Sequence, residues 1–157
     1  MSFPEKVYTG KEVKSAKALV DQGYKHKLMV EGKPDFTRKV KEALEYIETA
    51  GYLDYLQTFI RSITEIDGMT QLRQTEVAIW ANKFAVDNPV DAASLFIQKA
   101  FSMQEYLNGK LYYGGAAEKR SINKRIEFLQ VLKEKTSDRS VKEECDRLLG
   151  LWNDSSL

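Results

Sequence analysis

Cysteine and histidine are almost absent from this sequence of 157 residues, which contains one of each. The lone Cys145 cannot form an internal disulfide, so we expect a protein of a reducing compartment, the cytoplasm. The lone His26 excludes the zinc and di-iron sites that need several histidines. The glycine-rich loops that bind nucleotides are missing as well. We therefore predict no metal and no other cofactor.

Long hydrophobic runs are also missing, and the polar start of the chain has no apolar signal-peptide core. No stretch approaches the roughly 18 apolar residues of a membrane-spanning helix, so we predict no membrane association. The net charge is +1, from 24 basic and 23 acidic side chains, so no overall field attracts nucleic acid. Any site for a polyanion must be local.

Proline and glycine are few, three and nine respectively, and hydrophobic residues make up 43% of the chain. This composition is typical of an ordinary folded protein, and the length suits one hydrophobic core. We predict a single domain spanning residues 1–157, with flexible ends at 1–8 and 153–157.

Apolar residues recur three and four positions apart through most of the chain, which is the spacing of amphipathic helices. Segment 24–33 is too short to assign and is either extended or a loop. The fold expected from this pattern is all-α, a compact bundle of six or seven helices arranged largely as antiparallel hairpins. The predicted helices cover residues 9–22, 35–50, 53–66, 70–87 and 88–108, a segment that starts near 116, and 140–152.

Side chains typical of helix N-termini precede several of these segments. Asp35 and Thr70 are expected to cap the second and fourth helices. The strongest start signals are Thr9 with Glu12, Asn88 with Pro89, and Ser140 with Glu143.

The helix over 88–108 is predicted to be the central one, because apolar residues cover about two-thirds of its circumference. Phe96 and Phe101 are expected in the core. Its remaining polar residues form a thin strip that we expect to face water: Ser94, Gln98, Ser102 and Glu105.

The leading functional prediction is a small, non-catalytic protein-interaction or accessory module that binds another protein or a copy of itself. Phe128 and Val131 lie on a second side of the helix that starts near 116, away from its inward stripe. The loop before this helix carries Tyr112 and Tyr113. An exposed patch built from these four residues is the candidate interface, because contiguous apolar surface marks binding sites.

Nucleic-acid binding through the region Lys110–Arg125 is the first alternative. Lys119, Arg120 and Lys124 are candidate contacts for phosphate groups or another anion, and the tyrosines of the loop offer faces on which bases stack. On a helical wheel of the segment that starts near 116, Arg125 lies among the apolar residues and not on the exposed side with Arg120 and Lys124. An ion pair or an interface would hold it there.

An enzyme acting on a small molecule is the second alternative, with a site that the sequence does not reveal. No paired carboxylate, catalytic triad or metal cluster is recognisable, so we predict no catalytic residue. His26 is interpreted as a surface histidine, Cys145 as a core residue, and Lys99 as a lysine that either reaches to solvent or pairs with a buried acid.

Overall fold

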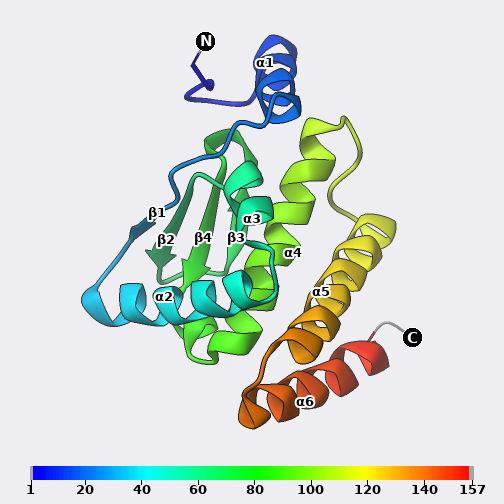
Figure 1. Ribbon diagram of the computed structural model, residues 1–157. Coiled ribbons are helices and arrows are strands. Elements are labelled where there is room, and N and C mark those ends of the chain that lie inside the picture. The colour runs from blue at the N-terminus through cyan, green and yellow to red at the C-terminus, as the bar shows by residue number, and fades with distance from the viewer. Residues whose placement is uncertain (1, 156–157) are drawn as a thin grey trace.

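The computed structural model describes residues 2–155, which combine a mixed sheet with six α-helices and two 3-10 helices (Figure 1). The α-helices are α1 (Gly10–Asp21), α2 (Pro34–Thr49), α3 (Leu53–Phe59), α4 (Pro89–Leu107), α5 (Gly115–Lys135) and α6 (Arg139–Ser155). The strands are β1 (Met29–Glu31), β2 (Ser62–Ile66), β3 (Gln71–Arg73) and β4 (Ala78–Asn82), with the 3-10 helices η1 (Gln74–Glu76) and η2 (Lys83–Val86) on either side of β4. The fold is therefore α/β, and the predicted all-α bundle is wrong.

The first error concerns the helix expected over 53–66, which ends as α3 at Phe59. Ile60 takes an extended backbone, with φ −128° and ψ 125°, and leads the chain into β2. β-Branched side chains such as Ile60 and Ile63 lose side-chain freedom in helices and pack well on a sheet. Ile60 and Ile63 keep the helical spacing of the apolar residues of α3, although Ile60 is extended and Ile63 belongs to β2.

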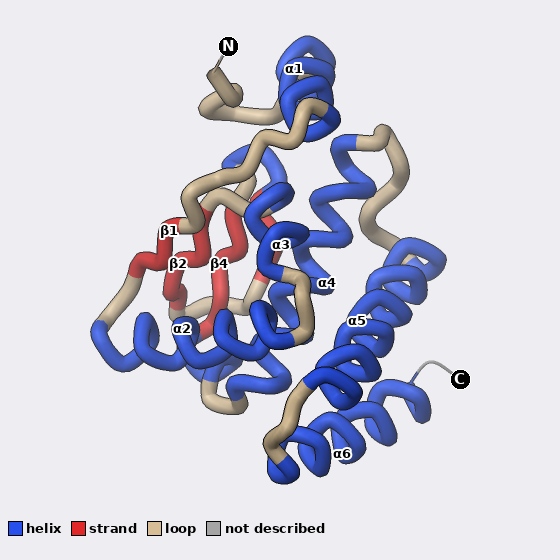
Figure 2. Tube along the Cα trace, in the orientation of Figure 1, coloured by secondary structure: helices blue, strands red, loops and turns tan. Residues whose placement is uncertain are grey.

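The second error concerns the helix expected over 70–87, which is absent from the described residues. This segment instead forms β3, η1, β4 and η2, and Figure 2 draws strands in red. Val77 has a left-handed backbone with φ +56°, which no helix accommodates at an interior position. Thr70 does not cap a helix, because its hydroxyl accepts a hydrogen bond from the backbone N–H of Asn82.

The strands are arranged in the order β1-β2-β4-β3, so β1 and β3 are the two edges of the sheet. β1 pairs parallel to β2, and β2 pairs parallel to β4, whereas β3 is antiparallel to β4. This register places Val30 beside Ile63 and Ile63 beside Ile79. Segment 24–33, which the sequence left open, therefore contains an edge strand.

The core lies between one face of the sheet and the helices. Ile63 and Ile79 on this face are fully buried and belong to one cluster with side chains of α2 and α4. On the opposite face, Thr64 and Trp80 remain partly exposed. The helices therefore cover the sheet from one side.

α4 is the central helix, as predicted, because it contacts every other α-helix and also β3. Phe96 is fully buried in it, whereas Phe101 is only partly buried. The polar strip of this helix is not the wet surface that the sequence suggested, because Ser94, Gln98 and Glu105 are all buried. α5 packs along α4, and α6 folds back on α5 on the side away from the sheet (Figure 1).

Two predicted helix starts are confirmed. Thr9 and Glu12 form the capping box of α1, and Asn88 caps α4 through hydrogen bonds from the next two backbone N–H groups, with Pro89 at the first helical position. Two others are wrong. Asp35 lies inside the first turn of α2, whose N-cap is Lys33, and α6 begins at Arg139 with its first N–H groups bound by Asp138.

The N-terminal segment lies against the domain. Val7 is fully buried, and its backbone N–H donates to the carbonyl oxygen of Thr75. Arg61 donates to the carbonyl oxygens of Pro4 and Glu5. At the other end α6 extends to Ser155, and the remaining residues of the predicted flexible end, 156 and 157, lie outside the described part of the chain.

Candidate functional site

The four residues of the predicted interface do not form one exposed patch. Phe128 is fully buried, and its ring meets that of Tyr52 edge to face at 5.3 Å. Val131 is partly buried against the core. Tyr113 is 63% exposed, but Tyr112 lies between the rings of Tyr113 and Tyr106. The prediction that Phe128 is exposed is therefore wrong. Of the predicted interface, only the tyrosine loop remains at the surface.

Two of the three predicted phosphate contacts are already engaged within the chain. Arg120 donates to Glu105 at 2.8 Å and to the carbonyl oxygen of Leu111 at 3.0 Å. Lys124 pairs with Glu127 at 3.1 Å and lies over the rings of two tyrosines, Tyr52 and Tyr55. Lys119 is exposed and, within the described residues, forms no ion pair with an acidic side chain. Internal acids thus neutralise most of this basic region.

His26 is buried, contrary to the surface position expected from the sequence. Its ring packs edge to face against Phe3 and Tyr24, with ring centroids 4.4 and 5.0 Å away. Its Nε2 is buried and accepts no hydrogen bond from the described residues. Burial, reinforced by the nearby positive charge of Arg61, lowers the pKa of His26 to about 4. The imidazole is therefore neutral near pH 7.

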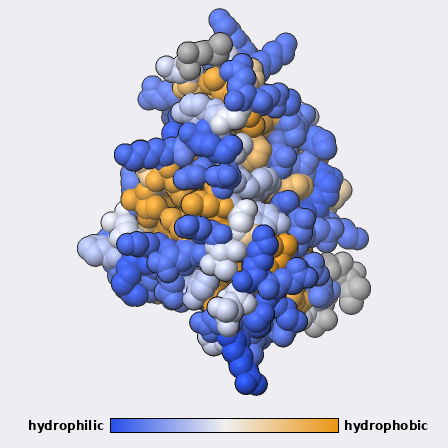
Figure 3. All heavy atoms as spheres, in the orientation of Figure 1, coloured by the Kyte–Doolittle hydropathy of each residue, from blue (hydrophilic) through white to orange (hydrophobic). Residues whose placement is uncertain are grey.

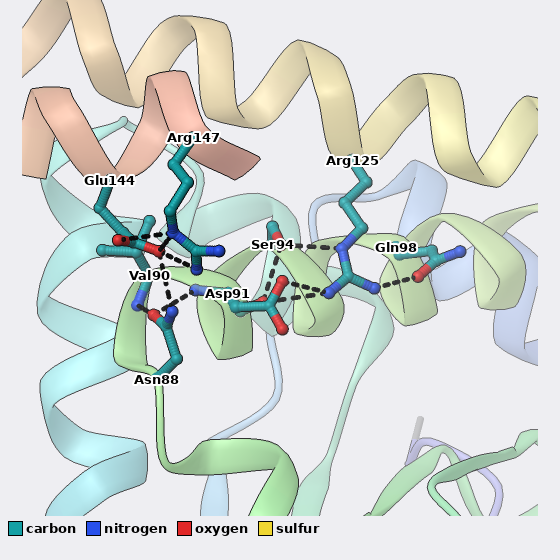
Figure 4. A network of polar contacts seen from close by, with 8 residues as sticks. All are labelled: Asn88, Val90, Asp91, Ser94, Gln98, Arg125, Glu144 and Arg147. Atoms are coloured by element: carbon teal, nitrogen blue, oxygen red, sulfur yellow. Dashed lines mark hydrogen bonds and ion pairs between the residues drawn. The ribbon is translucent and has the colours of Figure 1, made fainter. Parts of the chain in front are cut away.

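Arg125 is the centre of a buried polar network that joins α5 to α4 (Figure 4). Its guanidinium donates to Asp91 Oδ1 at 2.7 Å, to Ser94 Oγ at 2.8 Å and to Gln98 Oε1 at 2.8 Å. Gln98 in turn donates to Ser121 Oγ on α5 at 3.0 Å. These contacts explain why Ser94 and Gln98 of the polar strip are buried, and Arg120 of α5 pairs with Glu105, the last residue of the strip.

The network continues to α6. The ring of Trp152 lies 4.2 Å from the guanidinium carbon of Arg125. Glu144 accepts from Asn88 at 3.0 Å and forms an ion pair with Arg147 (Figure 4). The network thus connects α4 with both helices of the α5–α6 hairpin.

These polar groups hold helices together and are poorly placed for catalysis. A pocket of about 350 Å³ opens beside them, yet both charged side chains in its wall, Asp91 and Arg147, are fixed in ion pairs. Lys99 is nearby and partly buried, without an ion pair among the described residues. Its pKa is lowered by burial and by the charge of Arg125. No described carboxylate is within ion-pair reach of this lysine to act with it.

A second pocket of about 190 Å³ lies at the carboxyl ends of the parallel strands, where open α/β sheets often bind ligands. The wall of this pocket includes Lys33 and Glu65. Glu65 accepts a hydrogen bond from the backbone N–H of Lys33 at 2.8 Å. Gly32 makes this approach possible, because a Cβ at this position would lie only 2.7 Å from Phe36 and 2.8 Å from Glu65.

The edge strand β1 offers unpaired backbone groups. The N–H of Met29 donates to the carbonyl oxygen of Arg61, so in the parallel ladder Met29 and Glu31 direct their peptide groups at β2. The N–H and C=O of Val30 therefore point outward, where no further strand of the sheet follows within residues 2–155. An open edge of this kind is a template for pairing with another chain.

A groove runs beside this edge, between β1 and the helices α2 and α3. Two adjoining depressions of about 410 and 350 Å³ share Lys41 and Leu44. The apolar residues of the walls are only partly buried: Leu28, Val30, Leu44 and Leu53. Figure 3 shows apolar surface gathered above α2 on this side of the molecule. We call this surface, with the open side of β1, the β1 groove.

The sequence contained a weak signal for the β1 groove. Leu28 and Val30 are two residues apart and are flanked by Lys27 and Glu31, a partial alternation because Met29 between them is also apolar. Leu44 follows the helical spacing of Val40 and Ile47, and nothing local in the sequence indicates that this apolar face extends beyond the sheet edge. The pairing of β1 with β2, about 33 residues later, creates the groove.

The chain matches no protein-family model, no curated protein and no solved structure. Within residues 2–155, no three histidine, cysteine, aspartate or glutamate side chains are grouped so that they could hold a metal ion. None of the described helices combines the length and the apolar character needed to cross a bilayer. Function is therefore inferred from the geometry of the surface.

Proposed function

We propose that this protein is a non-catalytic protein-interaction module that binds an extended protein segment in the β1 groove. The bound segment pairs with the outward N–H and C=O groups of Val30 as an additional strand. Its alternate side chains pack on Leu28, Leu44 and Leu53. Main-chain hydrogen bonds supply the register, and the apolar wall selects the side chains.

The observation that carries this proposal is the combination of an open strand edge with an apolar groove directly beside it. Either feature alone is common on protein surfaces. Together they match the two requirements of strand addition, which are free peptide groups and a place for every second side chain. The tyrosine loop and the basic region offer no comparable combination, because much of their chemistry is used within the chain.

No specific observation favours nucleic-acid binding over this proposal. Arg120 and Lys124 pair with acidic residues, and only Lys119 of the predicted set remains available in the described part of the chain. A cytoplasmic location stays part of the proposal. It is supported by the scarcity of cysteine and by the burial of Cys145, which is not exposed for disulfide formation.

The proposal is tested by selecting binders from a displayed library of random linear peptides on the immobilised protein. We expect enriched peptides to alternate apolar and polar residues and to lose binding to Leu44→Gln and Lys41→Glu. The matched control is Leu111→Gln, which removes a 60% exposed leucine from a different surface. Circular dichroism establishes that each variant is folded. Peptides that bind all variants equally, or a library without enrichment on a chain that is monomeric in solution, would contradict the proposal.

A further inference from the structure

The charges on the groove side of α2 are polarised along the helix. Its N-terminal half carries Arg38 and Lys41, and its C-terminal half carries Glu45 and Glu48. All four side chains are exposed, and Arg38 also pairs with Asp35 of the same helix at 2.7 Å, so Lys41 is the basic group of this half that forms no ion pair among the described residues. A parallel neighbour with the same pattern would place like charges together. An antiparallel copy of the same helix would place each basic end against an acidic one.

From this polarity we infer that the segment bound in the β1 groove is β1 of a second copy of this chain, paired antiparallel across a two-fold axis at Val30. The inference rests on the proposed function and names its partner. A two-fold interface uses the same patch on both subunits, so the patch must complement itself. The antiparallel α2 helices meet this condition through their charges.

The backbone geometry of β1 is also compatible with self-pairing. The outward N–H and C=O of Val30 form the hydrogen-bonded pair at the axis, each with Val30 of the second copy. Leu28 then lies opposite Gly32 of the second copy. The apolar side chains of Leu28 and Val30 from both copies lie on the helix side, where each copy covers the partly exposed wall of the other. The two sheets become one continuous sheet.

This register makes a specific prediction for cysteine cross-linking. Met29 lies opposite Glu31 of the second copy in a non-hydrogen-bonded pair, where Cα atoms are about 4.5 Å apart, within the range of a disulfide. Two copies of Met29, or two of Glu31, are diagonal neighbours at about 7–8 Å, beyond that range. Both native side chains are exposed, and Cys145 is buried, so it does not compete.

The first experiment mixes Met29→Cys protein with Glu31→Cys protein under mild oxidation and resolves the products on a non-reducing gel. We expect a covalent dimer from the mixture and little from either variant alone. The second experiment measures sedimentation of wild type and of two charge variants, Arg38→Glu/Lys41→Glu and Glu45→Lys/Glu48→Lys. We expect a wild-type dimer, monomers from each variant alone, and a restored dimer from their mixture.

A wild-type chain that stays monomeric at millimolar concentration would overturn the inference. A dimer without the mixed disulfide would also overturn it, because the two copies would then meet elsewhere. The proposed function fails separately. If the chain is monomeric but selected peptides still depend on Leu44, the β1 groove binds another protein and the second copy alone is excluded.

Discussion

Replacing Arg125 by methionine is expected to destabilise the fold strongly. Arg125 is 5% exposed and donates to three side chains of α4, those of Asp91, Ser94 and Gln98. Methionine retains much of the length and the contact with Trp152 but removes every donor. The three acceptors then lose their partner while they remain near or inside the core.

The magnitude follows from the degree of burial. Removing one partner of a buried ion pair costs about 3–5 kcal/mol, because the other charge stays behind uncompensated. The Asp91 side chain is 34% exposed, so water recovers part of its solvation, and we expect a loss near 3 kcal/mol. Urea unfolding followed by circular dichroism measures the change. The matched control is Arg139→Met, whose side chain is 92% exposed and whose loss should cost at most about 0.5 kcal/mol.

A double variant separates the network from general packing. Arg125→Met/Asp91→Ala should be less destabilised than the sum of the two single changes, with a coupling of about 1–3 kcal/mol, because the stranded carboxylate is gone. A loss below about 1 kcal/mol for Arg125→Met, or additive effects in the double variant, would refute the reasoning. α4 would then be held to α5 by apolar packing alone.

Two further changes test the core. The pKa of His26 is lowered to about 4 by burial, against about 6.5 in an unfolded chain, so unfolding takes up a proton and stability falls as the pH drops from 6.5 towards 4. The stability of His26→Phe relative to wild type should therefore rise by about 2 kcal/mol between pH 7 and pH 5, and a constant difference would show that the histidine is solvated. Phe96→Ala should cost about 3–5 kcal/mol in the same unfolding assay, and Phe101→Ala clearly less, because Phe101 is only partly buried. Equal losses of stability for the two variants would contradict the orientation of α4, which buries Phe96 more deeply than Phe101.

Local signals predicted α1, α2, α4, α5 and α6, but they extended α3 into β2 and gave a helix where β3 and β4 lie. The capping box of Thr9 and the Asn88-Pro89 start act within a few residues, so they are readable in one sequence. β1 and β3 contain three residues each, too few for an alternating pattern to stand out. Ile63 continues the helical spacing of α3, and only its pairing with Ile79 makes it a strand residue. This pairing is a long-range contact.

The burial of the polar strip of α4 was missed for a related reason. A helical wheel shows that Ser94 and Gln98 are polar, but it does not show that Arg125 and Ser121 of another helix cover them. The suspicion that Arg125 occupies an ion pair agrees with its contact to Asp91. Phe128 illustrates the opposite case, because Tyr52 covers a side of α5 that the wheel left open. Which face is exposed depends on the neighbours that the fold supplies.

Amide hydrogen exchange of β1, followed residue by residue by NMR, tests the central claim most directly. The N–H of Met29 and Glu31 point at β2 and should be protected at every concentration, which makes them internal controls. The N–H of Val30 points outward. We predict that its exchange slows by about tenfold or more when the chain associates or binds a selected peptide. Unchanged exchange at Val30 under conditions of proven binding would contradict the claim that β1 is the binding element.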